Sequence, residues 1–193
     1  MEQLDIVDEK GNPTGETVPR EVAHREGIRH RTAHVWIFRR RGDTVQVLLQ
    51  KRSDNKDSDP GCYDISSAGH IPAGSDYIPS AVRELKEELG VDITGSELIY
   101  CGQRRVRFEK EFHGSMFRDN QISNVYALWF DREETDFTLQ EEEVSEVHWM
   151  DFADCVAAVR ENRIPHCIYM EELEILSNAL KLSDRSAGDP FCH

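Results

Sequence analysis

The sequence predicts an α+β protein in which a few helices pack against a mixed β-sheet as an α/β/α sandwich. Strand-like segments and amphipathic helical segments alternate along the chain, and neither an internal repeat nor a linker divides it. The 193 residues are 38% hydrophobic and 31% charged, a composition typical of globular domains. We therefore expect a single domain over residues 1–182 and a flexible tail over 183–193.

The chain is expected to begin with a β-hairpin over residues 4–19, because the turn-forming segment 8–13 separates two short extended runs. Further strands are expected at 33–38, 45–50, 63–68, 98–107, 122–130 and 144–150. Helices are expected between Asp76 and Gly90, which favour a helix start and a helix end, and at 152–160 and 168–182. The connecting segments 53–60, 108–121 and 131–143 are expected to be loops.

The helix between Asp76 and Gly90 carries three carboxylates at spacings of three and four. Glu84, Glu87 and Glu88 fall within an arc of roughly 100° on an α-helix. Like charges this close repel one another unless a cation lies between them, and hard oxygen ligands suit Mg²⁺ or Mn²⁺. The alternative is a solvated acidic helix surface. The glycine-rich loop before the helix favours the metal site, because such a loop brings backbone atoms close to a ligand.

This segment resembles the Nudix box, Gly-x5-Glu-x7-Arg-Glu-apolar-x-Glu-Glu-x-Gly-apolar. Eight of the nine specified positions match, namely Gly69, Arg83, Glu84, Leu85, Glu87, Glu88, Gly90 and Val91. The exception is Ser75, which stands where the family has its first glutamate, with Asp76 one residue out of register. The resemblance implies a Nudix-type α/β/α sandwich with the box helix against a mixed sheet.

The resemblance also implies the reaction and the residues that carry it. Nudix hydrolases cleave a diphosphate bond with the help of a divalent ion, here Mg²⁺ or Mn²⁺, and the expected ligands are Gly69, Glu84, Glu87 and Glu88. Arg83 would orient the carboxylates. The general base stays open between Asp119 and the run 141–143, for each of which solvation of a loop is the alternative. The expected catalytic set is therefore Arg83, Glu87 and Asp119.

A wider pattern is similar to type I isopentenyl diphosphate isomerases over residues 3–175. In those enzymes a metal-binding histidine set falls on His24, His30 and His70. A cysteine they require is replaced by Ala68, and one of two later carboxylates is replaced by Gln121. We therefore disfavour isomerase activity. The three histidines are interpreted either as a second metal site or as residues satisfied by hydrogen bonds.

Composition limits the partners. A formal net charge of −14 argues against a nucleic-acid backbone as ligand and favours a small-molecule diphosphate drawn to a metal-loaded site. Candidate cations at the mouth of this site, each otherwise an ordinary exposed cation, are Lys51, Arg52, Arg104, Arg105 and Arg107. No apolar run approaches the roughly 20 residues that span a bilayer, and no signal peptide is recognisable at the N-terminus. Five scattered cysteines favour reduced thiols and a cytoplasmic location.

Three functions follow as hypotheses. The first is a metal-dependent hydrolase of a nucleoside diphosphate derivative or another small organic diphosphate. The second is an isomerase-like enzyme with a rearranged site, which Ala68 and Gln121 disfavour. The third is a non-catalytic diphosphate-binding module, for which Ser75 is the best clue. The substrate and the oligomeric state, including a homodimer, are left open.

Overall fold

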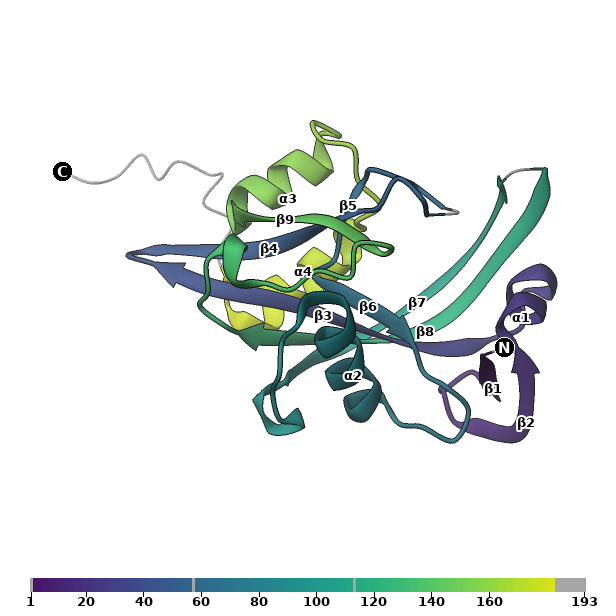
Figure 1. Cartoon of the computed structure of the whole chain (residues 1–193). Coiled ribbons are helices and arrows are strands. Elements are labelled where there is room, and N and C mark those ends of the chain that lie inside the picture. Colours follow the sequence, from purple (N-terminus) through teal and green to yellow (C-terminus); the bar gives the residue numbers. More distant parts are fainter. Residues whose placement is uncertain (1, 57, 113, 183–193) are drawn as a thin grey trace.

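The computed structural model describes residues 2–56, 58–112 and 114–182 (Figure 1). A two-stranded hairpin of β1 (Gln3–Val7) and β2 (Pro13–Pro19) precedes α1 (Arg20–Glu26). The main sheet contains β3 (His30–Arg41), β4 (Thr44–Arg52), β5 (Tyr63–Asp64), β6 (Ser67–His70), β7 (Ile99–Phe112), β8 (Ser115–Trp129) and β9 (Val144–Asp151). The remaining helices are α2 (Tyr77–Leu89), α3 (Phe152–Arg160) and α4 (Met170–Leu180), with 3-10 turns at Gly95–Glu97 and Glu134–Asp136.

The sheet is mixed and is organised around β3. The strand order is β5-β4-β3-β8-β7, with β6 pairing with β3 and β9 pairing with β4. β3 runs antiparallel to β4 and β6 and parallel to β8, so that Ala33 lies opposite both Gly69 and Asn124. Residues from the start of β3, from β6 and from β8 are therefore neighbours in space.

Alternate residues of β3 point to opposite faces of the sheet, and each face has its own core. One core combines Ala33, Val35 and Ile37 with Leu85 and Leu89 of α2. The other core combines Trp36 and Phe38 of β3 with Val156 of α3 and Leu173 and Leu176 of α4. Helices thus cover both faces of the sheet (Figure 1), which confirms the predicted sandwich.

The ends of α2 lie where the sequence predicts them. The Asp76 carboxylate accepts a hydrogen bond from the Tyr77 N–H at 2.7 Å at the first turn. Gly90 closes the helix in the left-handed conformation at φ 66°, which a glycine adopts without steric cost. The hairpin predicted over residues 4–19 is also confirmed, as the antiparallel pair β1 and β2. None of the described helices combines the length and the apolar character needed to cross a membrane.

Three elements differ from the sequence prediction. The strand expected at 63–68 is divided into β5, which pairs with β4, and β6, which pairs with β3. The segment 108–121 is not a loop, because β7 and β8 continue as one long hairpin, with Phe108 opposite Asp119 and Lys110 opposite Phe117. This part of the hairpin projects beyond the sheet (Figure 1), so it shows little of the apolar alternation by which strands are recognised. The helix α1 was not expected, because only Ala23 and His24 of its seven residues are buried. His113 and the predicted tail 183–193 lie outside the described residues.

The N-terminal hairpin is fixed to the loop that leads into α2. The Ala73 N–H donates to the Gln3 carbonyl at 2.8 Å, and Leu4 forms a β-bridge with Pro72. Arg31 of β3 ties both parts together, since one of its nitrogens donates to Asp5 and to the Ser75 carbonyl at 2.9 Å each. The hairpin therefore supports the loop that carries Gly74 and Ser75.

Candidate active site

The first carboxylate of α2 lies directly against β6. A Cβ added to Gly69 would lie 2.3 Å from the carboxyl carbon of Glu84. Real Cβ atoms essentially never come so close, and only glycine leaves room for this carboxyl group beside the strand. The Glu84 side chain is mostly buried, and burial raises its pKa, with the guanidinium of Arg83 opposing this effect.

Arg83 holds two of the three carboxylates. Its guanidinium donates to Glu84 Oε1 at 2.7 Å and to Glu87 Oε2 at 2.8 Å. Glu87 is half exposed, whereas Glu84 is not. The three glutamates do not converge as one ligand group within the described residues, because Arg83 keeps Glu84 and Glu87.

Glu88 is the buried member of the group. Its side-chain oxygen Oε2 has no hydrogen-bond partner, and only 6% of the residue is exposed. Burial raises the pKa of Glu88 to about 7, and the nearby Glu84 charge adds to the rise. A buried carboxylate oxygen without a donor, next to a second carboxylate, is the environment that a divalent cation stabilises. The residues present therefore fit a divalent ion.

The residue that departs from the box pattern does not reach this group. Ser75 is exposed in the loop before α2, and its carbonyl accepts the hydrogen bond from Arg31. Asp76 does not take the place of the family's glutamate, because its carboxylate caps the Tyr77 N–H and is 80% exposed. The chain has no carboxylate at the first position of the box.

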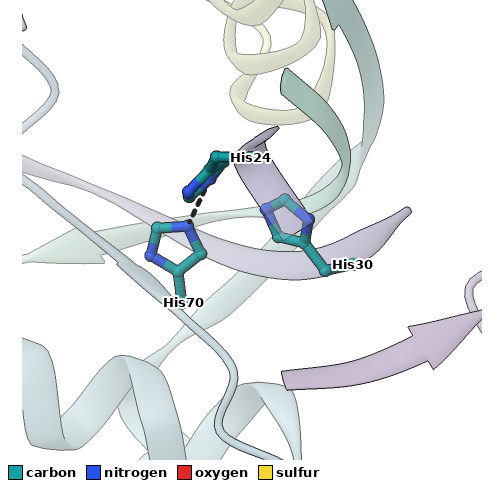
Figure 2. Close-up of side chains that lie close together, drawn as sticks. All are labelled: His24, His30 and His70. Atoms are coloured by element: carbon teal, nitrogen blue, oxygen red, sulfur yellow. Dashed lines mark hydrogen bonds between the residues drawn. The ribbon is translucent and has the colours of Figure 1, made fainter. Parts of the chain in front are cut away.

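Three histidines meet on the other face of β6 (Figure 2). His24 comes from α1, His30 from the start of β3 and His70 from the end of β6, and one ring nitrogen of each lies within 4.8 Å of the others. The Nε2 atoms of His24 and His70 are 3.3 Å apart. Burial lowers the pKa of His24 to about 3, and it lowers the pKa values of His30 and His70 as well. The rings are thus neutral, and each has a lone pair for a metal or a hydrogen bond.

Asp119 faces this cluster from β8. His30 Nδ1 lies 2.9 Å from the Ile28 carbonyl and donates to it, which leaves its Nε2 as the acceptor nitrogen. That Nε2 atom and Asp119 Oδ1 are 3.9 Å apart, and both are buried without a hydrogen-bond partner. Burial raises the pKa of Asp119 to about 6. Two facing acceptors in a buried position suit a cation, which both can bind.

A chain of polar side chains connects Asp119 to α4. Gln121 donates to Asp119 at 2.7 Å and accepts from the Thr32 hydroxyl at 3.3 Å. That hydroxyl lies 3.4 Å from His34, whose other ring nitrogen contacts Glu172. All of these groups lie on the face of the sheet that carries α3 and α4.

Glu172 is the residue that the sequence reasoning missed. It is 1% exposed, accepts from the Trp36 indole N–H at 2.9 Å and pairs with Arg104. Burial alone would raise its pKa, but the nearby His34 and Arg104 outweigh burial and hold the pKa below its usual value. A signal was present, since Glu172 lies four residues before Leu176 on the apolar side of α4.

The acidic run 141–143 and the five candidate cations do not gather around the glutamates of α2. Glu143 forms an ion pair with Lys56 and lies near the end of α2, whereas Glu141 and Glu142 are exposed. The expected cations do not form one ring around the site, because several already pair with carboxylates and the others line a separate hollow. Lys51 pairs with Glu146, Arg52 with Asp64 and Arg104 with Glu172, and Arg105 and Arg107 line the hollow.

Comparison with known proteins decides the family. The family model described as NUDIX domain matches residues 28–168 of this chain. The chain belongs to the Nudix family. This confirms the family predicted from the box, and Nudix hydrolases generally need divalent metal ions.

Individual Nudix proteins resemble the chain to different extents. Nudix hydrolase 3 of Arabidopsis thaliana is 41% identical over 163 residues, which cover 79% of this chain but only 20% of that protein. An uncharacterized Nudix hydrolase of Clostridium acetobutylicum is 40% identical over 143 residues, covering 74% of this chain and 66% of its own length. A crystal structure from Deinococcus radiodurans has a TM-score of 0.65 at 20% identity, covering 90% of this chain and 98% of that one, and supports the fold.

Proposed function

We propose that the Nudix protein hydrolyses the diphosphate bond of a small organic diphosphate, with nucleoside diphosphate derivatives as the first class to test. The observation that carries this proposal is the buried, partnerless oxygen of Glu88 beside Glu84, which itself lies against Gly69. Such a group of carboxylates is stable when a divalent ion, Mg²⁺ or Mn²⁺, lies between them.

Each residue of the box has a distinct task in this proposal. The Gly69 carbonyl and the carboxylates of Glu84, Glu87 and Glu88 hold the ion. The ion, when bound, neutralises charge on the phosphoryl oxygens and makes water more acidic. Arg83 is a positioning residue, because its guanidinium holds Glu84 and Glu87 at 2.7 and 2.8 Å.

The attacking water needs a proton acceptor. Asp119 is our first choice, because it is buried, lies beside the histidines and has a raised pKa of about 6, close to what a base at neutral pH requires. Glu143 is the alternative, since its partner Lys56 places it near Glu88. Asp119→Asn should lower kcat if Asp119 is the base, and Glu143→Gln should do so if Glu143 is the base.

The deciding experiment is a panel of diphosphate substrates assayed with Mg²⁺, with Mn²⁺ and with a chelator. We expect release of phosphate or of a monophosphate with either ion and none with the chelator. Glu84→Gln should abolish turnover, whereas Glu21→Gln, an exposed residue on α1, should not. If no substrate turns over with either ion, the hydrolase proposal fails. Tight binding that Glu84→Gln leaves intact would instead favour a binding module.

We further propose that His24, His30 and His70 hold a second divalent ion, with Asp119 facing them. The support is the mutual approach of three neutral imidazoles and the facing, partnerless acceptors of His30 and Asp119. The test is Co²⁺ binding, followed by its visible absorption, in protein that carries Glu84→Gln and Glu88→Gln so that the box cannot contribute. Binding should persist in this variant and disappear with His24→Ala and His70→Ala added. Loss of Co²⁺ binding in the first variant would contradict a separate site.

The same histidines are the reason to keep the isomerase-like branch as the second candidate. Against isomerisation, Ala68 lies opposite His34 where the isomerase-like pattern has a thiol, and Gln121 is occupied with Asp119 and Thr32. We therefore expect no exchange of deuterium from solvent into isopentenyl diphosphate. Exchange by the unmodified protein would make the isomerase the correct assignment.

We also propose that residues 1–182 act as one unit in the cytoplasm. Two cores share the β3 strand and the N-terminal hairpin is bonded to β3 and to the loop before α2, which supports a single unit. Light scattering after gel filtration decides between a monomer and a homodimer.

A further inference from the structure

A hollow on the α2 face of the sheet lies apart from the glutamates of α2 and on the opposite face from the histidines. Its volume is about 290 Å³, and it is formed by the middle of β7 and β8 and by the turn of the N-terminal hairpin. Three arginines line it, Arg29, Arg105 and Arg107, together with Glu9 from the turn. The hollow therefore combines three positive charges with one negative charge.

The strand register explains why these arginines meet. Arg105 and Arg107 are two residues apart on β7, so both point to the same face of the sheet. They lie opposite Ile122 and Asn120 of β8. Arg29 directly precedes His30, which lies opposite the next β8 residue, Gln121. Arg104, which neighbours Arg105, points to the other face and pairs with Glu172.

These three arginines differ from most others in the chain. Arginines elsewhere in the described residues mostly pair with carboxylates, as Arg31 does with Asp5, or lie over aromatic rings, as Arg40 does over Trp129. Across the same described residues, Arg29, Arg105 and Arg107 have neither kind of partner. In a chain with a net charge of −14, carboxylates to pair with them are abundant. Three unpaired guanidinium groups lining one hollow therefore indicate a ligand that is itself an anion.

Local hydrogen bonds and a close contact with β8 hold the turn that forms one wall of the hollow. The Asp8 carboxylate accepts from the N–H groups of Lys10 and Asn12 at 2.8 and 2.9 Å, which fixes the turn around Glu9. Gly11 lies against β8, because a Cβ added there would be 3.3 Å from Ile122. The Val7 N–H donates to the Arg29 carbonyl at 3.1 Å, so the hairpin is attached at the arginine itself. Hydrogen bonds within the turn and to Arg29 therefore hold the wall in place.

We propose that this hollow binds the phosphate group of a small phosphate-bearing molecule, at a site separate from the glutamates that would hold the ion. The N–H groups of a guanidinium match the oxygens of a phosphate in geometry. The three positive charges of the arginines outnumber the single negative charge of Glu9, so the hollow has a net positive charge. The separation follows from the sheet. The strands β6, β3, β8 and β7 lie side by side in this order. Gly69 on β6 and Arg105 on β7 are therefore three strand spacings, or about 14 Å, apart across the sheet.

The test is calorimetric titration of inorganic phosphate into the full chain, with a chelator present so that no metal ion can bind phosphate elsewhere. We expect one site whose affinity falls as salt is added. Arg105→Gln with Arg107→Gln should weaken binding at least about tenfold, because two of three charge-assisted contacts are lost. Glu9→Gln should tighten binding, since it removes the one opposing charge. The matched control is Arg25→Gln with Arg163→Gln, which removes two exposed arginines that are already paired with Glu26 and Glu161.

The outcomes separate clearly. Loss of binding in the Arg105 and Arg107 variant, with the control unchanged, supports the site. Equal loss in both variants would show that only the overall charge matters, and binding unaffected by either variant would place the anion elsewhere. No binding of phosphate by the unmodified chain overturns the proposal. A parallel titration with a nucleoside monophosphate identifies the source of the phosphate: equal affinity favours free phosphate, and tighter binding that the same variant abolishes favours a nucleotide.

Discussion

The glutamates of α2 and the histidines beside Asp119 lie on opposite faces of β6, and they are built in opposite ways. The glutamates are close in sequence, and two of them are held by a partly exposed arginine, Arg83. The histidines come from three separate elements and have neutral rings, with His24 and His30 buried and His70 half-buried. Adjacent residues of one strand, Gly69 and His70, join the two groups.

The glutamate group is contained in one helix, whereas the histidine group exists only once the chain has folded. A helix brings residues at spacings of three and four together wherever it lies, so the glutamate group follows from the sequence of one element. The histidine group requires α1, β3, β6 and β8 to meet. Glu84 and Glu87 keep Arg83 as a partner that they can exchange for an ion, whereas the histidines and Asp119 already face one another.

The largest expected effect is that of Gly69→Ala, which acts on the glutamate group alone. The new methyl group would overlap the Glu84 carboxyl group, so Glu84 must move away from β6. We expect turnover to fall at least about 1000-fold, roughly 4 kcal/mol of transition-state stabilisation, while the protein stays folded. Steady-state kinetics and a thermal melt measure the two effects.

Gly95→Ala is the matched control for this substitution. Its added Cβ would also come within 2.3 Å of a side chain, but that side chain is the exposed Ile78, which can move into solvent. Activity should be retained. Equal loss of activity in both variants would show that the effect is a general disturbance of α2 and not the contact with Glu84.

The second largest effect is expected on the histidine side, from Glu172→Gln. The substitution removes a buried charge that His34, Arg104 and Trp36 all contact, and it leaves Arg104 with only the exposed carboxylate of Glu171 as an ion-pair partner. Breaking a buried pair in this way costs about 3 kcal/mol of unfolding free energy. Urea unfolding at neutral pH measures it. An unchanged midpoint would show that Glu172 does not hold α4 to the sheet.

The same variant has a defined pH dependence. Because the pKa of Glu172 is lowered in the folded protein, its ionised form stabilises the fold above the unfolded pKa of about 4.3. That stabilisation is lost as the pH falls through the folded pKa. The difference in stability between the unmodified protein and Glu172→Gln should therefore shrink in acid.

These two predictions also show which parts of the molecule the sequence could reveal. The ends of α2 were predicted because Asp76 and Gly90 act through local backbone geometry, and the box residues follow from spacing within one helix. The role of Glu172 was not predicted, because its partners His34 and Arg104 lie more than 60 residues away in sequence. The β7–β8 extension was missed because projecting strands bury little and lose the apolar alternation.

A smaller effect is expected for Arg83→Gln. Glu84 and Glu87 remain in place on α2, but the guanidinium that orients them is lost. Residues that orient ligands typically contribute 10- to 100-fold, so we expect kcat to fall by about that factor with KM for the substrate little changed. Lys86→Gln is the control, because Lys86 lies on the same helix but pairs with the exposed Asp92. A rise in KM with kcat unchanged would show that Arg83 contacts the substrate.

The smallest effect tests whether the glutamate group contributes to folding at all. Arg83 and Glu87 form an i,i+4 pair whose side chains are 40% and 52% exposed, and such pairs contribute about 0.3–0.5 kcal/mol. A double-mutant cycle with Arg83→Gln and Glu87→Gln should therefore give a coupling of this size, which falls further in high salt because the pair is accessible to solvent. A coupling above ~1 kcal/mol would mean that Arg83 supports the fold as Glu172 does, and the contrast between an adjustable glutamate group and a fixed histidine group would not hold.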